Sequence, residues 1–274
     1  MNFIPIVTSE AGACLTSANW SEVHVGSVAY SLESLLFKPG LSLLKKIPDI
    51  KSYLGWSGQF ILNGKNLSAN KAGTYTLKSP FDGSTIKFTS IELVELIQHL
   101  KPDVVILPKK IMQEQPNAWV DWGDAIKAFI HVDDLQHQDV PAGHGVYFDD
   151  LGTQDRLIED LHKWSHLARY VTGVVHLDLM QRLITQAGVL IESDEPAKAA
   201  IQGMVYSKSG LVDLTDKQTE LQFEPIDADC GCPTCSQQLT KAYLHHLLLH
   251  TPLLCQRFLI QHNIYHWTKV NQVA

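Results

Sequence analysis

The chain has 274 residues, of which 45% are hydrophobic and 19% charged, with a net charge of −7 and a pI near 6.0. This length allows one large domain or two modest ones with a full core. The negative charge argues against a nucleic-acid-binding surface along the whole molecule, which depends on neutralised phosphates, but leaves room for a local basic patch. No apolar run reaches the roughly 18 to 20 residues that span a bilayer, and the start does not resemble a signal peptide. We therefore expect no membrane partner and a cytoplasmic location.

Strand-like and helix-like patterns alternate along the first 200 residues. Three apolar runs are predicted to be buried strands: residues 3–7, 23–28 and 103–107. Three segments with apolar residues at helical spacing are predicted helices that lead into β-rich runs: residues 91–100, 157–167 and 177–186. Residues 56–87 are richer in Gly, Ser, Thr and Asn, which predicts hairpins or an inserted loop. Strands that alternate with helices in this way indicate βαβ units and a parallel sheet.

Three of the five cysteines lie within six residues near the C-terminus. Cys230, Cys232 and Cys235 have the spacing of metal ligands rather than of a disulfide framework. Zinc needs ligands that converge from short turns, and Gly231 lets the chain bend between two thiolates. We expect His262, just past a long helical stretch, as the fourth ligand among the candidates that follow: His245, His246, His250, Cys255, His262 and His266. The alternative is three reduced, unligated thiols. A closed site with four ligands would be structural.

These residues also carry a family resemblance. Residues 225–235 (PIDADCGCPTC), residues 241–247 (KAYLHHL) and the pair His262 and Asn263 resemble the C-terminal signature of the tRNA-guanine transglycosylases, the queuine and archaeosine tRNA-ribosyltransferases. The gap from cysteine to histidine is one residue longer than in that family. Weaker similarities follow the family's order along the chain: residues 3–8, 35–40, 57–60, 81–84 and 169–174.

The resemblance implies an α/β fold with a (β/α)8-type barrel, shortened or degenerate, in residues 1–223. A zinc-binding helical module, in residues 224–274, follows it. A barrel alone takes about 250 residues. We therefore expect one or two βα units between residues 110 and 169 to be missing or reduced.

The family exchanges a guanine in tRNA for a 7-deazaguanine. The reaction needs a nucleophilic carboxylate, a second carboxylate for proton transfer and an acidic residue that recognises the guanine edge. Trp56 and Lys109 stand where the resemblance places the last two, and a protonated lysine cannot accept a hydrogen bond. The nucleophile is expected in residues 189–196 (VLIESDEP), at Asp194 or Glu192, with the register open by one or two positions. The full set of expected pocket residues is Trp56, Ser57, Gly58, Lys109, Asp150 and Gly173.

Two functions follow from this pattern. One is a divergent pentosyltransferase acting on a nucleoside or nucleic-acid base other than the family's guanine, with tRNA or a nucleoside as substrate. The other is a catalytically inactive paralogue that binds RNA or a catalytic transglycosylase subunit. Family members pair through the C-terminal region, where two apolar helical stretches flank Pro252. We therefore expect a homodimer, or a heterodimer with a full-length family member. Exchange of guanine in tRNA is not expected.

Overall fold

The computed structural model describes residues 3–270 except 117–121, 123–124, 138–139 and 141. The chain forms two compact units. Unit 1 comprises Met1–Gly26, Val174–Thr185 and Ser193–Ala274, and unit 2 comprises Ser27–Gly173 and Gln186–Glu192. The expected boundary after residue 223 falls inside unit 1 and stays a prediction. No helix in the described part of the chain is long and apolar enough to cross a bilayer.

Eight strands belong to one sheet in the order β1-β10-β9-β8-β7-β6-β3-β2. Their bounds are β1 (Phe3–Pro5), β2 (Ser27–Ser31), β3 (Gln59–Asn63), β6 (Val104–Ile106), β7 (Lys127–His131), β8 (Gly145–Phe148), β9 (Ala168–Thr172) and β10 (Val189–Ser193). Every neighbouring pair from β2 to β10 is parallel. From β2 to β10, each strand of this sheet lies beside the sheet strand that follows it in the chain, as in a (β/α)8 barrel. The strands β1 and β2 end the order, and no pairing between them is present among the described residues. The fold is thus mixed α/β with a nearly closed eight-stranded parallel barrel, which confirms the predicted class.

Between residues 110 and 169, one or two βα units were expected to be missing or reduced, and the strands β7 and β8 are both present. Among the described residues, the segments after β6 and β7 hold only α6 (Ile111–Glu114) and the 3-10 helix η4 (Val132–His137). The strand expected at residues 23–28 begins only at Ser27, because His24 adopts a left-handed φ of 59°.

Residues 56–87 were expected to hold hairpins or a loop, and they hold more. They contain the barrel strand β3 as well as an antiparallel hairpin of β4 (Thr74–Lys78) and β5 (Thr85–Thr89). The rings of Tyr75 and Phe88 stack across this hairpin with centroids 5.2 Å apart. The many turn-forming residues of the hairpin hid the apolar pattern of β3, which precedes it in the sequence.

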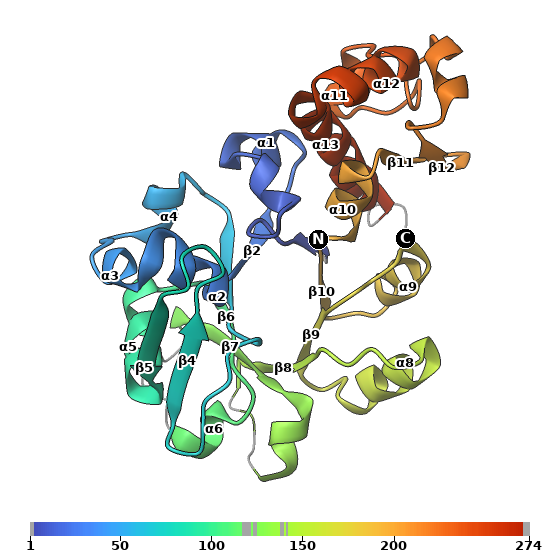
Figure 1. The fold of residues 1–274 in the computed structure, drawn as a ribbon. Helices are drawn as coiled ribbons and strands as arrows, with labels where there is room; N and C mark the ends of the chain where they lie inside the picture. The colour runs from blue at the N-terminus through green and yellow to red at the C-terminus, as the bar shows by residue number, and fades with distance from the viewer. Residues whose placement is uncertain (1–2, 117–121, 123–124, 138–139, 141, 271–274) are drawn as a thin grey trace. The chain divides into compact units, whose positions relative to one another are not determined.

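Helices connect and cover the strands (Figure 1). They are α1 (Ser17–Glu22), α2 (Leu32–Leu35), α3 (Leu41–Leu44), α4 (Ile50–Leu54), α5 (Ser90–Leu100), α8 (Gln154–Lys163), α9 (Leu177–Leu183) and α10 (Glu195–Ile201), with shorter turns at η1 (Gly12–Cys14), η2 (Leu36–Gly40) and η5 (Lys217–Leu221). The start of α5 shows why the chain is helical there. Thr89 and Glu92 form a capping box, and the apolar face that repeats every three to four residues is buried.

The C-terminal part of unit 1 contains the hairpin β11 (Met204–Ser207) and β12 (Gly210–Asp213), followed by α11 (Pro233–Ser236), α12 (Lys241–His250) and α13 (Pro252–Val270). Asn263 of α13 is fully buried. Its side-chain amide donates to the carbonyls of Pro196 and Met204 at 3.0 and 2.9 Å, and its oxygen accepts from the Tyr206 N–H at 3.1 Å. This single side chain therefore joins α13 to β11 and to the start of α10.

Candidate metal centre and barrel site

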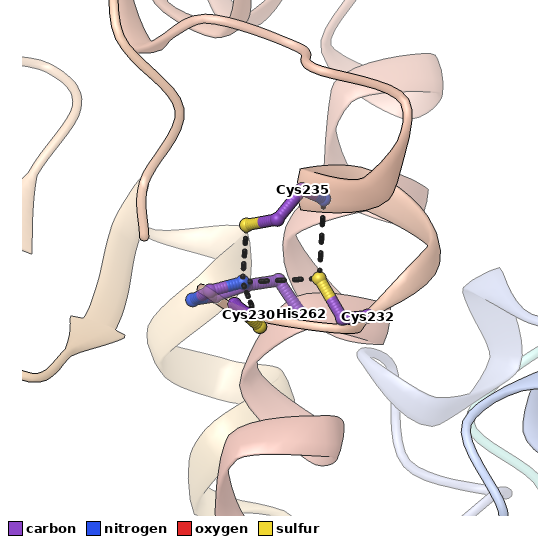
Figure 2. Close-up of side chains that lie close together, drawn as sticks. All are labelled: Cys230, Cys232, Cys235 and His262. Atoms are coloured by element: carbon purple, nitrogen blue, oxygen red, sulfur yellow. Dashed lines mark hydrogen bonds between the residues drawn. The ribbon is translucent and has the colours of Figure 1, made fainter. Parts of the chain in front are cut away.

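Three cysteines and one histidine of unit 1 point toward a common centre (Figure 2). The sulfurs of Cys230, Cys232 and Cys235 lie 3.9, 3.3 and 3.4 Å from Nδ1 of His262. All four potential ligand atoms lie within 4.8 Å of one another. The cysteines come from the turn that leads into α11, and the histidine comes from α13. The group could hold a metal ion.

The surroundings of this cluster suit a ligand set. Nε2 of His262 hydrogen-bonds to the Tyr206 carbonyl at 2.6 Å, which leaves Nδ1 facing the sulfurs, as is usual for metal-bound histidine. The backbone N–H of Cys235 donates to the Cys232 sulfur at 3.2 Å. An added Cβ at Gly231 would lie 2.8 Å from the Tyr265 hydroxyl, so the end of that side chain would have to move. Four donors and near-complete burial leave no open position, so a bound ion would hold the fold.

The competing ligand candidates are engaged elsewhere. The buried Cys255 thiol donates to the Leu244 carbonyl at 3.2 Å, and burial raises its pKa to about 12. Nδ1 of His245 hydrogen-bonds to the Leu214 carbonyl at 2.7 Å. The ring of His246 packs against that of His250, with centroids 4.5 Å apart. Among the described side chains, only the cluster with His262 brings three or more such donors together.

A second set of polar side chains meets in unit 2, at the carboxyl ends of the strands. Glu192 of β10 is only 1% exposed. The amide of Asn63 donates to both of its carboxylate oxygens at 2.8 and 2.9 Å. The hydroxyls of Tyr170 and Thr172 each donate to one oxygen at 2.7 Å. Burial, and then the neighbouring carboxylate, raise the pKa of Tyr170 well above its usual value, so the phenol stays a donor. Four hydrogen bonds therefore hold one buried carboxylate in a fixed position.

An ion-pair network lies at the ends of three neighbouring strands. Lys109 follows β6, His131 ends β7 and Asp149 follows β8. The Lys109 ammonium lies 3.0 Å from the Asp149 carboxylate, which also contacts Nε2 of His131 at 2.9 Å. Burial alone would raise the pKa of Asp149, but hydrogen bonds from Lys109 and His131 outweigh it and lower the pKa below its ordinary value. A small cavity of about 110 Å³ opens beside this network and is lined in part by Asp150.

Three expected pocket residues lie before the start of β3, away from the carboxyl ends of the strands. Trp56, Ser57 and Gly58 precede β3, whereas barrel chemistry occurs at the carboxyl ends of the strands. Trp56 is a core residue, 5% exposed, and its indole N–H donates to the Gln59 carbonyl at 3.1 Å. Trp56 therefore does not lie beside Lys109, and the residue at the carboxyl end of β3 is Asn63.

The remaining expected residues lie at the carboxyl ends of strands. Gly173 directly follows β9 with a φ of +145°, and an added Cβ would lie 3.3 Å from the Leu151 side chain. Asp150 follows β8 and accepts from the Gly152 N–H at 3.1 Å, as a turn residue does. Asp194 follows β10, belongs to unit 1 and pairs with Lys198 of α10 at 3.0 Å. Of the carboxylates of Glu192 and Asp194, only that of Glu192 belongs to the polar set at the carboxyl ends of the strands.

Sequence reasoning missed three donors to Glu192 and the role of His131. Asn63, Thr172 and His131 are each the last residue of an apolar strand. A polar side chain at that position of a (β/α)8 barrel is the signal that would have identified them. Tyr170 carries no such signal, because it lies inside its strand.

Comparison with known proteins connects this fold to one family. Residues 156–273 match the family model for queuine tRNA-ribosyltransferase. The chain is 22% identical to the queuine tRNA-ribosyltransferase of Blochmanniella floridana, over 89% of this chain and 77% of the relative. It is 22% identical to the protein of that name from Synechococcus elongatus, over 96% and 80%. It is 23% identical to that of Dehalococcoides mccartyi, over 96% and 78%.

Proposed function

We propose that the chain, which is similar to queuine tRNA-ribosyltransferases over most of its length, is a divergent member of that family. In this proposal it is a pentosyltransferase for a nucleoside, or a nucleic-acid base such as one in tRNA, other than the family's guanine. The observation that carries the proposal is the buried Glu192 carboxylate at the carboxyl end of β10. Burying a carboxylate is costly, and proteins tolerate that cost most often at functional sites. The donors Asn63, Tyr170 and Thr172 offset the cost and aim the carboxylate.

In this reaction Glu192 acts as the nucleophile. One carboxylate oxygen bonds to C1′ of the ribose as the bond from C1′ to the base nitrogen breaks, and the bonding pair leaves with the base. The departing base takes up a proton from water. A nitrogen of the incoming base then attacks C1′ and releases the carboxylate, and the proton of that nitrogen returns to water. The hydroxyl of Tyr170 stabilises the charge on Glu192 when the carboxylate is free. The ion-paired Asp149 keeps Lys109 and His131 in place at the neighbouring strand ends.

The metal cluster has a separate, structural role. We propose that Cys230, Cys232, Cys235 and His262 bind one zinc ion, since three thiolates and one imidazole in a closed set form a common structural zinc site. The ion would join the turn before α11 to α13. Zinc binding should therefore stabilise unit 1 without taking part in pentosyl transfer.

A catalytically inactive paralogue that binds RNA or a catalytic family subunit is the second candidate. This candidate is supported by the hydrogen bonds that already occupy the Glu192 carboxylate. Each oxygen of Glu192 already accepts two hydrogen bonds, so a sugar reaches the carboxylate only after one of them opens. Asn63 also offers an amide, which cannot transfer a proton, at the carboxyl end of β3.

Base release from RNA separates these two candidates. The purified chain is incubated with total cellular RNA and a mixture of isotopically labelled free bases as acceptors, and the unlabelled bases released are measured by liquid chromatography and mass spectrometry. We expect the wild type to release a base other than guanine, and Glu192→Gln to release at least about 100-fold less. Asp194→Asn should retain activity, because Asp194 lies outside the polar set. No release by the wild type would leave only the inactive paralogue.

Guanine exchange provides the complementary assay. The family reaction needs one carboxylate for proton transfer and another for the guanine edge, but the strand ends offer Asn63 and Lys109. General acid–base assistance alone contributes about 10² to 10⁴ in rate. We therefore expect no incorporation of radiolabelled guanine into unmodified tRNA under conditions where a full-length family enzyme gives a clear signal. Incorporation that disappears in Glu192→Gln would show that guanine is a substrate after all.

A further inference from the structure

A lysine-rich pocket lies at the carboxyl ends of the neighbouring parallel strands β3 and β6. Its lining consists of residues 65–71, which follow β3, and of Lys109, Lys110, Gln113 and Glu114, which follow β6. The lining thus contains four lysines, two from each segment, and only one acidic residue. Its volume of about 560 Å³ falls within the range of small-molecule sites. The pocket therefore has both the position and the size of a ligand site in a barrel.

Most of its positive charge is not neutralised by the protein. Lys109 pairs with Asp149 at 3.0 Å. The ammonium groups of Lys65, Lys71 and Lys110 contact no carboxylate among the residues that the structure describes. Like charges that line one hollow repel each other, and a chain with a net charge of −7 has acidic residues enough to pair them. An anion bound in the pocket would remove this repulsion.

The backbone around the pocket is also constrained. Lys110 adopts a left-handed φ of 66°, and its N–H donates to the Asp134 carboxylate at 2.7 Å. Strained non-glycine positions of this kind cluster at ligand sites.

The pocket is coupled to the proposed reaction site by one side chain. The Lys65 N–H donates to the Asn63 side-chain oxygen at 3.0 Å, and the amide of Asn63 holds Glu192. We propose that this lysine pocket binds the phosphate group of a nucleotide, either free or within a polynucleotide. This binding site rests on the proposed function, because it would hold a phosphate near the carboxylate that is proposed to bind the sugar. Binding itself requires no pentosyl transfer.

Binding of phosphorylated and unphosphorylated probes tests the pocket. Affinities of the full chain are measured for guanosine, for guanosine 5′-monophosphate and for a five-nucleotide single-stranded RNA. The test variant is Lys65→Gln with Lys71→Gln. The matched control is Lys78→Gln with Lys87→Gln, which removes the same charge from exposed positions on β4 and β5. Thermal unfolding checks that both double variants stay folded.

We expect the wild type to bind at least one phosphorylated probe more tightly than guanosine. The test variant should bind that probe at least about tenfold more weakly, and the control should match the wild type. If the test variant binds only the RNA more weakly, the pocket holds a phosphate of a polynucleotide. If it also binds the monophosphate more weakly, the pocket holds the phosphate of a single nucleotide. The proposal would be overturned if the control variant lost as much affinity for the probe as the test variant. It would also be overturned if the wild type bound guanosine and its monophosphate equally well and the test variant bound RNA as tightly as the wild type. Phosphate binding without base release would retain the pocket and reject the proposed transfer.

Discussion

Loss of one metal ligand should destabilise unit 1 far more than loss of an equally buried thiol. Cys232 and Cys255 form a matched pair, because both are 0% exposed and only Cys232 belongs to the cluster with His262. A ligand present at 1,000 times its dissociation constant stabilises the folded state by about 4 kcal/mol. In a domain of this size 1 kcal/mol shifts the melting temperature by about 2 to 4 °C. Cys232→Ser should therefore lower the melting temperature by roughly 8 to 16 °C.

The control substitution keeps most of its interactions. In Cys255→Ser the hydroxyl can still donate to the Leu244 carbonyl, so the cost should be about 1 kcal/mol, or roughly 2 to 4 °C. Metal content is measured by mass spectrometry on protein purified without chelators, and unfolding is followed by circular dichroism with and without added zinc. The wild type and Cys255→Ser should each carry about one zinc per chain. A wild-type protein without metal would contradict this prediction. So would a Cys232→Ser protein that keeps its zinc and has the same melting temperature as Cys255→Ser.

Three further outcomes are expected. Asn263→Ala removes three buried hydrogen bonds and should cost about 3 kcal/mol in urea unfolding, and a cost below about 1 kcal/mol would show that they contribute little. Leu253 is 77% exposed on α13, so Leu253→Glu should convert the expected dimer into a monomer, whereas Leu211→Glu should not. Light scattering measures the oligomeric state, and a monomeric wild type would contradict this prediction. The lowered pKa of Asp149 means that its ion pairs stabilise the protein above the unfolded-state pKa of about 3.9 and lose this effect as the pH falls through the folded-state pKa. Asp149→Asn should therefore be less stable than the wild type at pH 6 and equally stable near pH 2, and a gap that persists in acid would exclude this origin.

The grouping of the three cysteines and the parallel sheet could be predicted from short-range patterns in the sequence, whereas the barrel was implied by the family resemblance. Three cysteines spaced over a turn must lie close together whatever the rest of the chain does. Alternating strands and helices of ordinary length have few topologies other than a parallel sheet. These two features needed no knowledge of which distant residues meet.

The residues of the barrel site depend on long-range pairing, which local sequence patterns do not encode. The resemblance at residues 57–60 placed Trp56 in the pocket. However, β3 begins only at Gln59, so Trp56 precedes the strand, and the residue at the carboxyl end of β3 is Asn63. Glu192 and Asp194 are two residues apart, so strand alternation would place both on one face, and only the end of β10 at Ser193 separates them. The contact between His131 and Asp149 joins separate strands, and no local pattern encodes it.

Formation of a covalent intermediate tests the central claim most directly. The chain is mixed with RNA, quenched in acid and analysed by intact-protein mass spectrometry after nuclease digestion. We expect a pentose-bearing adduct on the wild type and on Asp194→Asn, mapped by peptide sequencing to Glu192, and no adduct on Glu192→Gln. An adduct that persists in Glu192→Gln, or the absence of any adduct on a wild-type protein that binds RNA, would contradict it.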